Sequence, residues 1–404
     1  MARIDMLVKL LIMGFVYVNV ILGYVESSYS GVTGYHDAIS RMALFKAAHI
    51  IRNGAPQPQS YSTTLLVARS RVLHVTDYGA DPTGRLDSTE ALEQAISDAF
   101  GSPVDAHLME GIADLGGTEL HLDGGTYKIS RPLRLPKTSG GNFMIHGGSL
   151  HASNNFPTDR HLIELWPSSA SSSYEYITLK DLMINSNFRG GGISIINSLR
   201  TIIDNCYISH FTTNGILIQD GHETYIRNSF IGQHINIGGD HREKDFSGIG
   251  INIMGNDNAV TDVVIFSASI GVMVSGQANV LTGVHCYNKA TALGVEIVQL
   301  EQSNMPFTSI DQVVVDRNNV RGMVFKSTVA RGSVWSNGTT WTVDFSRVLL
   351  FPNLIKNVQY TLHAGATFPN HVLRNISKNC VTVESNVPIS ATLHVSVDQS
   401  MVGI

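Results

Sequence analysis

The stretch from Gly192 to Val272 decides the fold, because one glycine-led pair occurs four times in it, as Gly192-Ile193, Gly215-Ile216, Gly250-Ile251 and Gly271-Val272. The steps between these pairs are 23, 35 and 21 residues. A second series with matching steps opens short apolar runs, at Asp181, Asp204, Arg227, Asp262 and Gly283. The period is too long for a coiled coil and the runs are too short for helices, so the repeats must stack around a shared core. The sequence therefore predicts a parallel β-helix.

The composition suits such a solenoid and limits its partners. The chain has 404 residues, of which 15% are charged and 37 are glycine. The net charge is −5 and the sequence pI is about 6.3. Nucleic-acid-binding proteins usually present a basic surface, so no nucleic-acid partner is expected. We expect a monomer that needs no cofactor.

The first residues are typical of a secretory signal peptide, which we place over residues 1–26. Arg3 and Lys9 precede an apolar run from Leu10 to Val25, and small polar residues follow that run. An uncleaved membrane anchor is the alternative, but the run is short for a spanning helix of ~20 residues. We therefore expect a secreted protein without stable membrane association. Residues 27–70 would form an N-terminal helix and a linker.

Secretion would permit disulfides and glycans, so the cysteines and sequons matter. Cys206 and Cys286 lie three rungs apart, which at ~4.8 Å per rung is roughly 14 Å and beyond the ~7 Å reach of a disulfide. They are expected to fill the interior as small hydrophobic residues. No paired Cys or His spacing indicates a zinc site, so no metal is predicted. Asn337 and Asn375 begin two sequons and are candidate glycosylation sites.

Both ends of the predicted β-helix carry other elements. Before it, Asp87 and Glu90 form a capping box for a helix that would cover the open end of the stack, and Gly116–Ile129 would form the first rung. After it, the period fails beyond Tyr287, and short alternating runs from Gly322 onward predict a small antiparallel β unit. We therefore expect a parallel β-helix over residues 71–320 and a C-terminal β unit over residues 321–404.

The chain resembles the pectin-lyase-like β-helix proteins, and among them the quartet-type polygalacturonases of plants. The N-terminal signature is Val75-Thr76-Asp77-Tyr78-Gly79-Ala80-Asp81-Pro82-Thr83-Gly84. The most specific parts are Ile218-Gln219-Asp220-Gly221-His222-Glu223 and Gly255-Asn256-Asp257-Asn258-Ala259-Val260. The resemblance implies an all-β, right-handed parallel β-helix and an extracellular cell-wall protein that acts on homogalacturonan, an acidic polysaccharide. It also implies a shortened form, because the related enzymes carry more rungs beyond Tyr287.

The active-site motifs of glycoside hydrolase family 28 are only partly present, so the resemblance is to a divergent relative. That family carries Asn-Thr-Asp, Asp-Asp, Gly-His-Gly and Arg-Ile-Lys on successive rungs. Here the first rung reads Thr212-Thr213-Asn214-Gly215, in which an amide replaces the first carboxylate. The second reads Gly238-Gly239-Asp240, the third reads Ser269-Ile270-Gly271, and no Arg-Ile-Lys occurs. The standard set of catalytic groups is therefore incomplete.

The long step of 35 residues predicts an extra loop from Gln233 to Ser247. Strands of a β-helix are fixed, so functional variation is confined to such loops. Glycoside hydrolysis needs two carboxyl groups, and the candidates are Asp240 paired with Asp245, or with Asp220 one rung earlier. Strands at ~4.8 Å would bring like positions within the ~5–9.5 Å that glycosidases use. The candidate substrate-binding side chains are Arg227, Arg242, Lys244, His222 and His241.

These candidates also have purely structural interpretations. A charged run such as Asp240–Asp245 is often a solvated loop tip, and Asp220-Gly221 is a turn dipeptide. The recurrent Asp181, Asp204 and Asp262 are predicted to share one rung position and to end turns. Asn205 and Asn228 are predicted to belong to an internal amide ladder.

Three functions therefore stay open. The first is a hydrolase of polygalacturonan. The second is a pectate lyase, which would abstract a proton while Ca²⁺ sits on clustered carboxylates. It ranks lower because no tight acidic cluster stands beside an isolated Arg. The third is a non-catalytic β-helix that binds wall polysaccharide.

Overall fold

The structure is a computed structural model that describes residues 71–101, 106–136, 139–167, 173–232, 248–287, 298–300, 312–365 and 368–400. The chain divides into two compact units, Met1–Val67 and Ala68–Ile404, and every described residue belongs to the second. The predicted signal peptide (1–26) and N-terminal helix and linker (27–70) therefore lie outside the described residues. Within the described ranges, no helix has the length and apolar character needed to cross a membrane.

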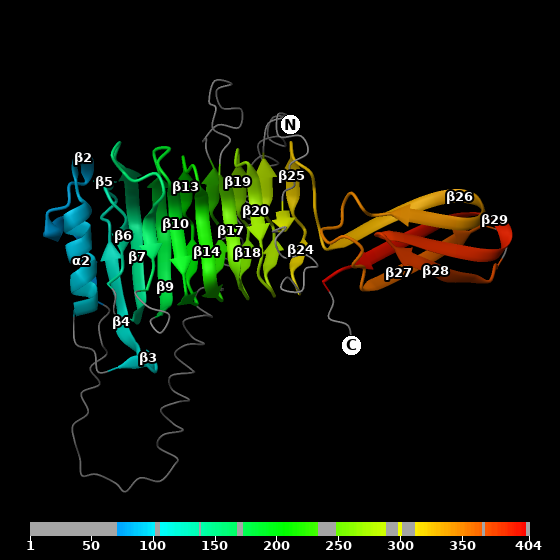
Figure 1. The fold of residues 1–404 in the computed structure, drawn as a ribbon, viewed down its shortest axis with the longest axis horizontal. Coiled ribbons are helices and arrows are strands. Elements are labelled where there is room, and N and C mark those ends of the chain that lie inside the picture. Colours follow the sequence, from blue (N-terminus) through cyan, green and yellow to red (C-terminus); the bar gives the residue numbers. More distant parts are fainter. Residues whose placement is uncertain are drawn as a thin grey trace, which may run out of the picture. The chain divides into compact units, whose positions relative to one another are not determined.

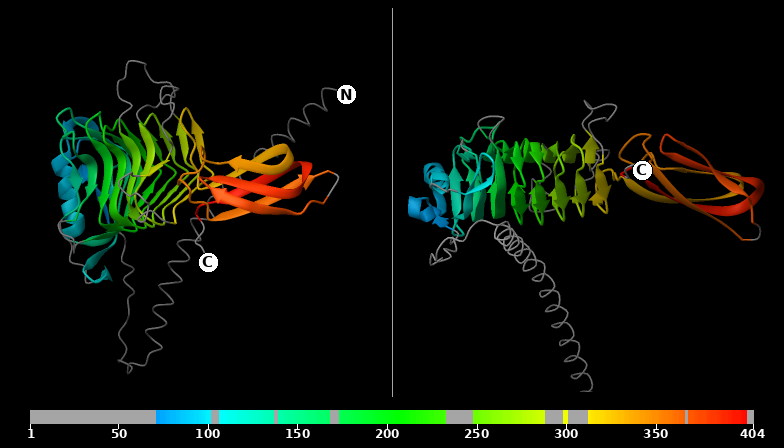
Figure 2. Two further views of the ribbon diagram at one scale, coloured as in Figure 1. Left: turned by 45° about the vertical axis from the view of Figure 1, so that its right-hand side comes forward. Right: turned by 90° about the horizontal axis from the view of Figure 1, so that it is seen from below.

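Most of the second unit is a parallel β-helix, whose regular turns contribute one strand to each of three ladders (Figure 1; Figure 2). The first ladder holds β8 (His161–Leu165), β10 (Gly191–Ile196), β14 (Asn214–His222), β17 (Ile249–Asn256), β20 (Ile270–Val274) and β23 (Val298–Leu300). The second holds β12 (Ile202–Asp204), β15 (Tyr225–Arg227), β18 (Ala259–Thr261), β21 (Val280–Thr282) and β24 (Val314–Asp316). The third holds β13 (Tyr207–Ser209), β16 (Phe230–Gly232), β19 (Val264–Phe266), β22 (His285–Tyr287) and β25 (Asn319–Arg321). All these pairings are parallel, which confirms the predicted fold class.

The N-terminal turns are less regular. Their elements are β1 (Val72–His74), η1 (Val75–Tyr78), β2 (Thr83–Asp87), β3 (His107–Met109), β4 (Ile112–His121), β5 (Thr126–Ile129), β6 (Leu133–Arg134), β7 (Gly140–Ala152), β9 (Tyr174–Asn185) and β11 (Ser198–Leu199). β1 pairs with β4 and β2 pairs with β5, both in parallel. The first turn is therefore formed by β1 and β2, and the segment Gly116–Ile129, predicted as the first rung, belongs to the second turn.

The glycine-led pairs form one column, as the repeat predicts. Along this column Ile193 pairs with Ile216, Ile216 with Ile251 and Ile251 with Val272, and all four side chains are fully buried. The preceding glycines permit close stacking. A Cβ on any of the first three would lie 2.5 to 2.6 Å from the carbonyl oxygen of the next glycine in the column. Branched aliphatic side chains thus fill the interior at the spacing of the strands.

The second series of the repeat divides into two columns that differ by one residue. Asp204 pairs with Lys180 and Arg227, so it is not in register with Asp181, and the prediction of one shared position is wrong for Asp204. The next column has φ between 51° and 65° and contains Asp181, Asn205, Asn228, Asp262 and Gly283. Asp, Asn and Gly tolerate this left-handed conformation best. The predicted internal amide ladder is also wrong, because Asn205 and Asn228 are exposed at this turn.

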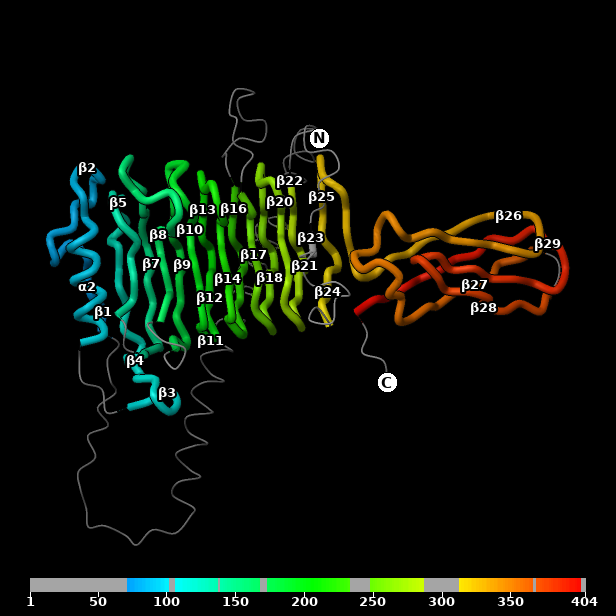
Figure 3. The backbone as a smooth tube through the Cα atoms, viewed as in Figure 1, coloured from blue at the N-terminus to red at the C-terminus, as the bar shows by residue number. Residues whose placement is uncertain are grey.

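The capping helix α2 (Thr89–Gly101) lies beside the N-terminal turns of the stack (Figure 3). Its apolar side belongs to the core of the β-helix. Its buried residues are Thr89, Leu92, Ala95, Ile96 and Ala99. The carbonyl of Ser88 accepts the first helical hydrogen bond, from the N–H of Leu92 at 3.0 Å. Asp87 accepts a hydrogen bond from the N–H of Thr89 at 2.9 Å. The N-cap is therefore Ser88, one residue after the predicted position.

The C-terminal β unit is a four-stranded antiparallel sheet with its own core. Its strands are β26 (Val329–Asp344), β27 (Asn357–Ala364), β28 (His371–Ser377) and β29 (Cys380–Asp398), and each of the other three pairs with β29. The buried Trp341 donates its Nε1–H to the carbonyl of Ala391 at 3.2 Å. The antiparallel unit is confirmed, and its first strand begins at Val329.

The three cysteines are free. Cys206 and Cys286 lie in the core of the β-helix, where burial raises the pKa of both thiols to about 12. The prediction that these two side chains act as small hydrophobic residues is confirmed.

Candidate functional site

The predicted loop falls between β16, which ends at Gly232, and β17, which begins at Ile249. Five of the predicted site residues belong to it and lie outside the described residues: Asp240, Asp245, Arg242, Lys244 and His241. Where the chain returns, the N–H of Ile249 donates to the carbonyl of Thr213 at 2.8 Å, and the carbonyl of Gly248 accepts from the N–H of Ser269 at 3.0 Å. The described chain therefore resumes at the start of the first ladder.

The start of the first ladder is also where the family-28 motifs would fall. Asn214 pairs with Ile249, and Ile249 pairs with Ile270. Ile249 therefore occupies the ladder position next to Asn214, to which the family-28 motifs had assigned Gly238-Gly239-Asp240, and those three residues lie outside the described residues. An amide and two isoleucines stand where the motifs would place charged or ionisable side chains.

Several buried polar atoms at this end of the ladder have no hydrogen-bond partner in the described structure. They are Oγ1 of Thr213, Oδ1 of Asn214, Oδ1 of Asn252 and both ring nitrogens of His161. Burial lowers the pKa of His161 to about 4, so the imidazole is neutral at higher pH. Buried polar atoms normally have partners, so these atoms mark a polar stretch of the ladder that is not satisfied within the described residues. No sequence motif marks His161, and sequence reasoning missed it.

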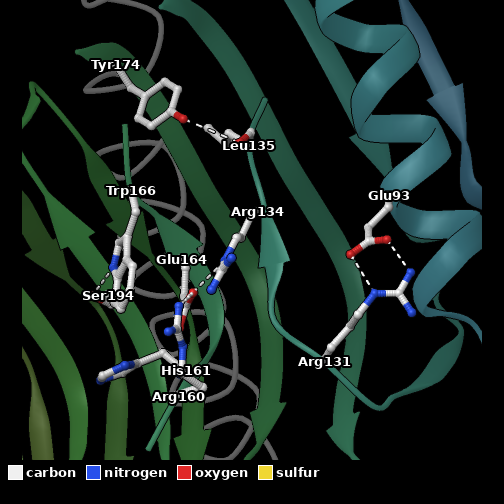
Figure 4. A network of polar contacts seen from close by, with 10 residues as sticks. All are labelled: Glu93, Arg131, Arg134, Leu135, Arg160, His161, Glu164, Trp166, Tyr174 and Ser194. Carbon is white, nitrogen blue, oxygen red and sulfur yellow. Dashed lines mark hydrogen bonds and ion pairs between the residues drawn. The ribbon is translucent and has the colours of Figure 1, made fainter. Parts of the chain in front are cut away.

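A fully buried carboxylate lies on the outward side of the first ladder (Figure 4). Glu164 accepts hydrogen bonds from Nε of Arg134 at 2.8 Å and from Nε and Nη2 of Arg160 at 2.8 and 2.6 Å. Burial raises the pKa of Glu164, but the hydrogen bonds from Arg160 and Arg134 outweigh burial and hold the pKa below its ordinary value. Arg160 also lies 4.2 Å from the ring centroid of Trp166, whose Nε1–H donates to Ser194 at 2.7 Å.

Arg134, Arg160 and Trp166 form what we call the basic–aromatic patch. Its two guanidinium groups face the buried carboxylate of Glu164, and the charge of Asp159 also acts on Arg160. About half of the Arg134 side chain is exposed, so this guanidinium is the part of the patch that can contact a further anion. β8, which carries Glu164, lies three ladder steps from β17, where the loop returns, or about 14 Å along the stack. The patch and the point at which the described chain resumes therefore border the same ladder. Sequence reasoning missed the patch because stacking brings together residues far apart in the chain, such as Arg134 and Trp166.

The remaining predicted residues lie away from the base of the loop. Asp220 is exposed near the end of β14, six residues after Asn214, which corresponds to about 20 Å of extended strand. His222 has its Nδ1 3.5 Å from Oδ2 of Asp257. Arg227, on the second ladder, donates from Nη2 to Oδ2 of Asp204 at 3.0 Å. The structure thus brings neither Asp220 nor Arg227 to the start of the first ladder.

A histidine–carboxylate group lies on the N-terminal turns. The Nδ1 atoms of His74 and His121 lie 2.6 and 2.8 Å from Oδ1 of Asp123, and Thr76 donates to Oδ2 of Asp123 at 3.0 Å. Within the described ranges, these two histidines and Asp123 form the one group whose donor atoms could hold a metal ion. Sequence spacing did not indicate the group, since His74 and Asp123 are 49 residues apart. Its three side chains already serve one another as hydrogen-bond partners.

This group gives the N-terminal turns a pH-dependent stability. Burial alone would raise the pKa of Asp123, but hydrogen bonds from His74, His121 and Thr76 lower it to about 2. A carboxyl whose folded pKa lies below its unfolded pKa stabilises fully above the unfolded value, about 4, and loses that contribution as pH falls through about 2. The same contact raises the pKa of His74. The stability that the protonated imidazole contributes is therefore lost as pH rises through that raised pKa.

Asp123→Asn is therefore expected to lower the free energy of unfolding by about 1–2 kcal/mol near pH 5 and to have little effect near pH 2. The measurement is urea denaturation of both proteins at several pH values. A difference that stays constant down to pH 2 would contradict the assignment.

No family model matches the chain. The chain is 50% identical to "Polygalacturonase QRT3" of Arabidopsis thaliana over 452 residues, which cover 92% of this chain and 94% of that protein. Since this match is longer than the 404 residues of the chain, some residues of that relative have no counterpart here. Among solved structures, PfbA, a surface adhesin of Streptococcus pneumoniae, is 16% identical with a TM-score of 0.45 and covers 63% of this chain and 73% of its own. ORF18 of Geobacillus virus E2 is 11% identical with a TM-score of 0.41 and covers 84% of this chain and 82% of its own.

Proposed function

We propose that this chain, which belongs to the polygalacturonase family of plants, is a secreted glycoside hydrolase that cleaves α-1,4-galacturonan in the cell wall. The observation that carries the proposal is the 50% identity over 92% of the chain to a protein named polygalacturonase. The parallel β-helix supports it, and so do the carboxyl-bearing residues in the stretch of sequence between β16 and β17.

For catalysis we propose the carboxyl pair Asp240 and Asp245. One would protonate the oxygen of the glycosidic bond, and the other would activate water or attack the sugar directly. Asp220 was the alternative partner of Asp240, but about 20 Å of strand separates it from the start of the first ladder, where the loop rejoins the stack. The pair within the loop is therefore preferred. This chemistry needs no cofactor.

Recognition of an acidic sugar chain needs cations and hydrogen-bonding groups along its path. Arg242, Lys244 and His241 of the loop would bind uronate carboxylates, and the basic–aromatic patch would continue that path along the first ladder. Thr213 and Asn214 lie at the start of β14, between β8 and β17 on the same ladder. Their unpartnered oxygens are buried and would accept hydrogen bonds from sugar hydroxyls once exposed. His222 and Arg227 already contact carboxylates of neighbouring rungs, so their proposed part in binding is smaller.

The test is incubation of the purified, secreted chain with polygalacturonate, with and without a chelator. We expect new reducing ends in both conditions, no unsaturated product, and a monomer by size-exclusion chromatography. Neutral galactan should be cleaved far more slowly, because it lacks the carboxylates. Unsaturated products that vanish with chelator would instead identify a pectate lyase, and binding without any product would identify a non-catalytic wall protein.

A further inference from the structure

The two sequons lie on strands at the edges of the C-terminal sheet. Asn337 is on β26 and Asn375 is on β28, and each of these strands pairs with β29 alone among the strands that the structure describes. Both asparagines are exposed. A register shift lies beside each one, between Gly338 and Thr340 and between Leu373 and Asn375. Both sites are thus accessible and locally irregular.

Trp335 is the second unusual feature of this sheet. It is two residues before Asn337 on β26, so the two side chains point to the same side of the strand. The face of the sheet that carries Trp335 is polar, because Trp335 pairs with Thr392 and Thr392 pairs with His363. Leu393 and Val395 of β29 point to the other side and are buried. A tryptophan that is 67% exposed on a polar surface is unusual for a folded domain and indicates that something covers it.

We propose that Asn337 and Asn375 carry N-linked glycans that cover the two edge strands, and that the first sugar of the Asn337 glycan packs on the indole of Trp335. The proposal rests on the secretion stated under the proposed function. In the transfer step, Nδ2 of the asparagine bonds to the anomeric carbon of an oligosaccharide carried on a lipid pyrophosphate. The bond from that carbon to the pyrophosphate oxygen breaks, Nδ2 loses one proton, and the lipid pyrophosphate leaves.

The geometry gives these glycans a physical role. An edge strand presents unpaired N–H and C=O groups that can pair with another chain, and β26 is 16 residues long. A glycan on each edge would block that pairing sterically. Packing of the apolar face of a sugar on the indole would remove apolar surface of Trp335 from water. One modification would thereby protect an edge and cover an exposed aromatic ring.

A pectic chain is the other occupant that this surface could take. A hollow of about 600 Å³ lies next to Trp335 on the same side, lined by Arg331, Ser333, Gln359, Thr361, His394 and Ser396. We favour the glycan because Asn337 places a sugar beside Trp335 by covalent attachment. A pectic chain bound there would have to share the surface with that glycan.

The experiment uses the full chain secreted from plant cells. Mass spectrometry of glycopeptides gives the occupancy of both sequons, and thermal unfolding is measured for the wild type, Trp335→Ala, Asn337→Gln and the double variant. We expect both sites to be occupied. Trp335→Ala should lower Tm by about 2 °C or more in the glycosylated chain, the shift of an ordinary favourable contact, and by almost nothing in the Asn337→Gln background.

Several results would overturn the inference. Glycosylation of Asn375 without Asn337 would overturn it while leaving secretion intact. Modification of neither site would overturn the inference but not secretion, which the recovery of the chain from the medium shows by itself. The reducing-end assay on the same protein would show separately whether hydrolysis stands. An equal Tm loss from Trp335→Ala in both backgrounds would refute the sugar contact. Weaker retention of Trp335→Ala on immobilised pectate, with or without Asn337, would assign the surface to the polysaccharide.

Discussion

Asp240→Asn is expected to release reducing ends from polygalacturonate at least about 10²-fold more slowly than the wild type, as is typical when an acid–base group is lost. The substitution removes one charge and keeps the shape of the side chain. Its cost in folding free energy should stay within about 0.5 kcal/mol, because the residue belongs to a loop inserted into the repeat. The measurement pairs initial rates with a denaturation curve for each protein. Normal activity of Asp240→Asn, or a loss of activity that unfolding explains, would mean that the loop has a structural role and no catalytic one.

Asp204→Asn is the matched control. Asp204 accepts hydrogen bonds from Nη2 of Arg227 at 3.0 Å and from Nδ2 of Asn228 at 2.9 Å, within a turn of the second ladder. Replacing its carboxylate should weaken these contacts and affect stability more than turnover. If Asp204→Asn lowered activity as much as Asp240→Asn without loss of stability, the assignment of catalysis to the loop would fail.

Glu164→Gln should lower the free energy of unfolding by about 3 kcal/mol. The carboxylate is fully buried between Arg134 and Arg160, and removing one member of a buried ion pair costs about 3–5 kcal/mol because the partner charges stay behind. The lower end of that range applies here, since about half of the Arg134 side chain is exposed and solvent screens its charge. Urea denaturation at neutral pH measures the loss.

Glu93→Gln provides the comparison, because Glu93 also pairs with an arginine and lies in the same view (Figure 4). Nε of Arg131 donates to Glu93 at 3.0 Å, but both side chains are substantially exposed. Exposed ion pairs contribute about 0–1 kcal/mol, so this variant should be nearly neutral. Equal losses from the two substitutions would contradict the view that burial gives Glu164 its effect.

The fold could be predicted because its physical requirement repeats in the sequence. Each turn needs a small residue where backbones approach closely, followed by branched aliphatic side chains, and Gly215-Ile216 and Gly250-Ile251 meet that need in register. The one-residue error at Asp204 has a simple cause. Both the last residue of a strand and the left-handed residue after it favour polar side chains, so the spacing alone could not separate their two columns.

The site could be predicted only in part. The extra length of one repeat predicts a loop with acidic residues, and these residues lie outside the described ones. The sequence could not show that Ile249 is the residue that pairs with Asn214. Contacts between side chains of stacked turns could not be predicted from the sequence either. Glu164 finds Arg134 30 positions away, and His74 finds Asp123 49 positions away, with no shared motif. Such groups depend on the register between turns, which is a property of the assembled stack.

The central claim is hydrolysis of galacturonan, and the mass of the reaction products tests it most directly. The purified chain is incubated with a defined galacturonate oligomer in the presence of a chelator, and the fragments are weighed by mass spectrometry. Our account predicts two saturated fragments whose masses sum to that of the oligomer plus one water. Fragments that sum to the mass of the oligomer alone, or an oligomer that persists uncut at high protein concentration, would contradict it.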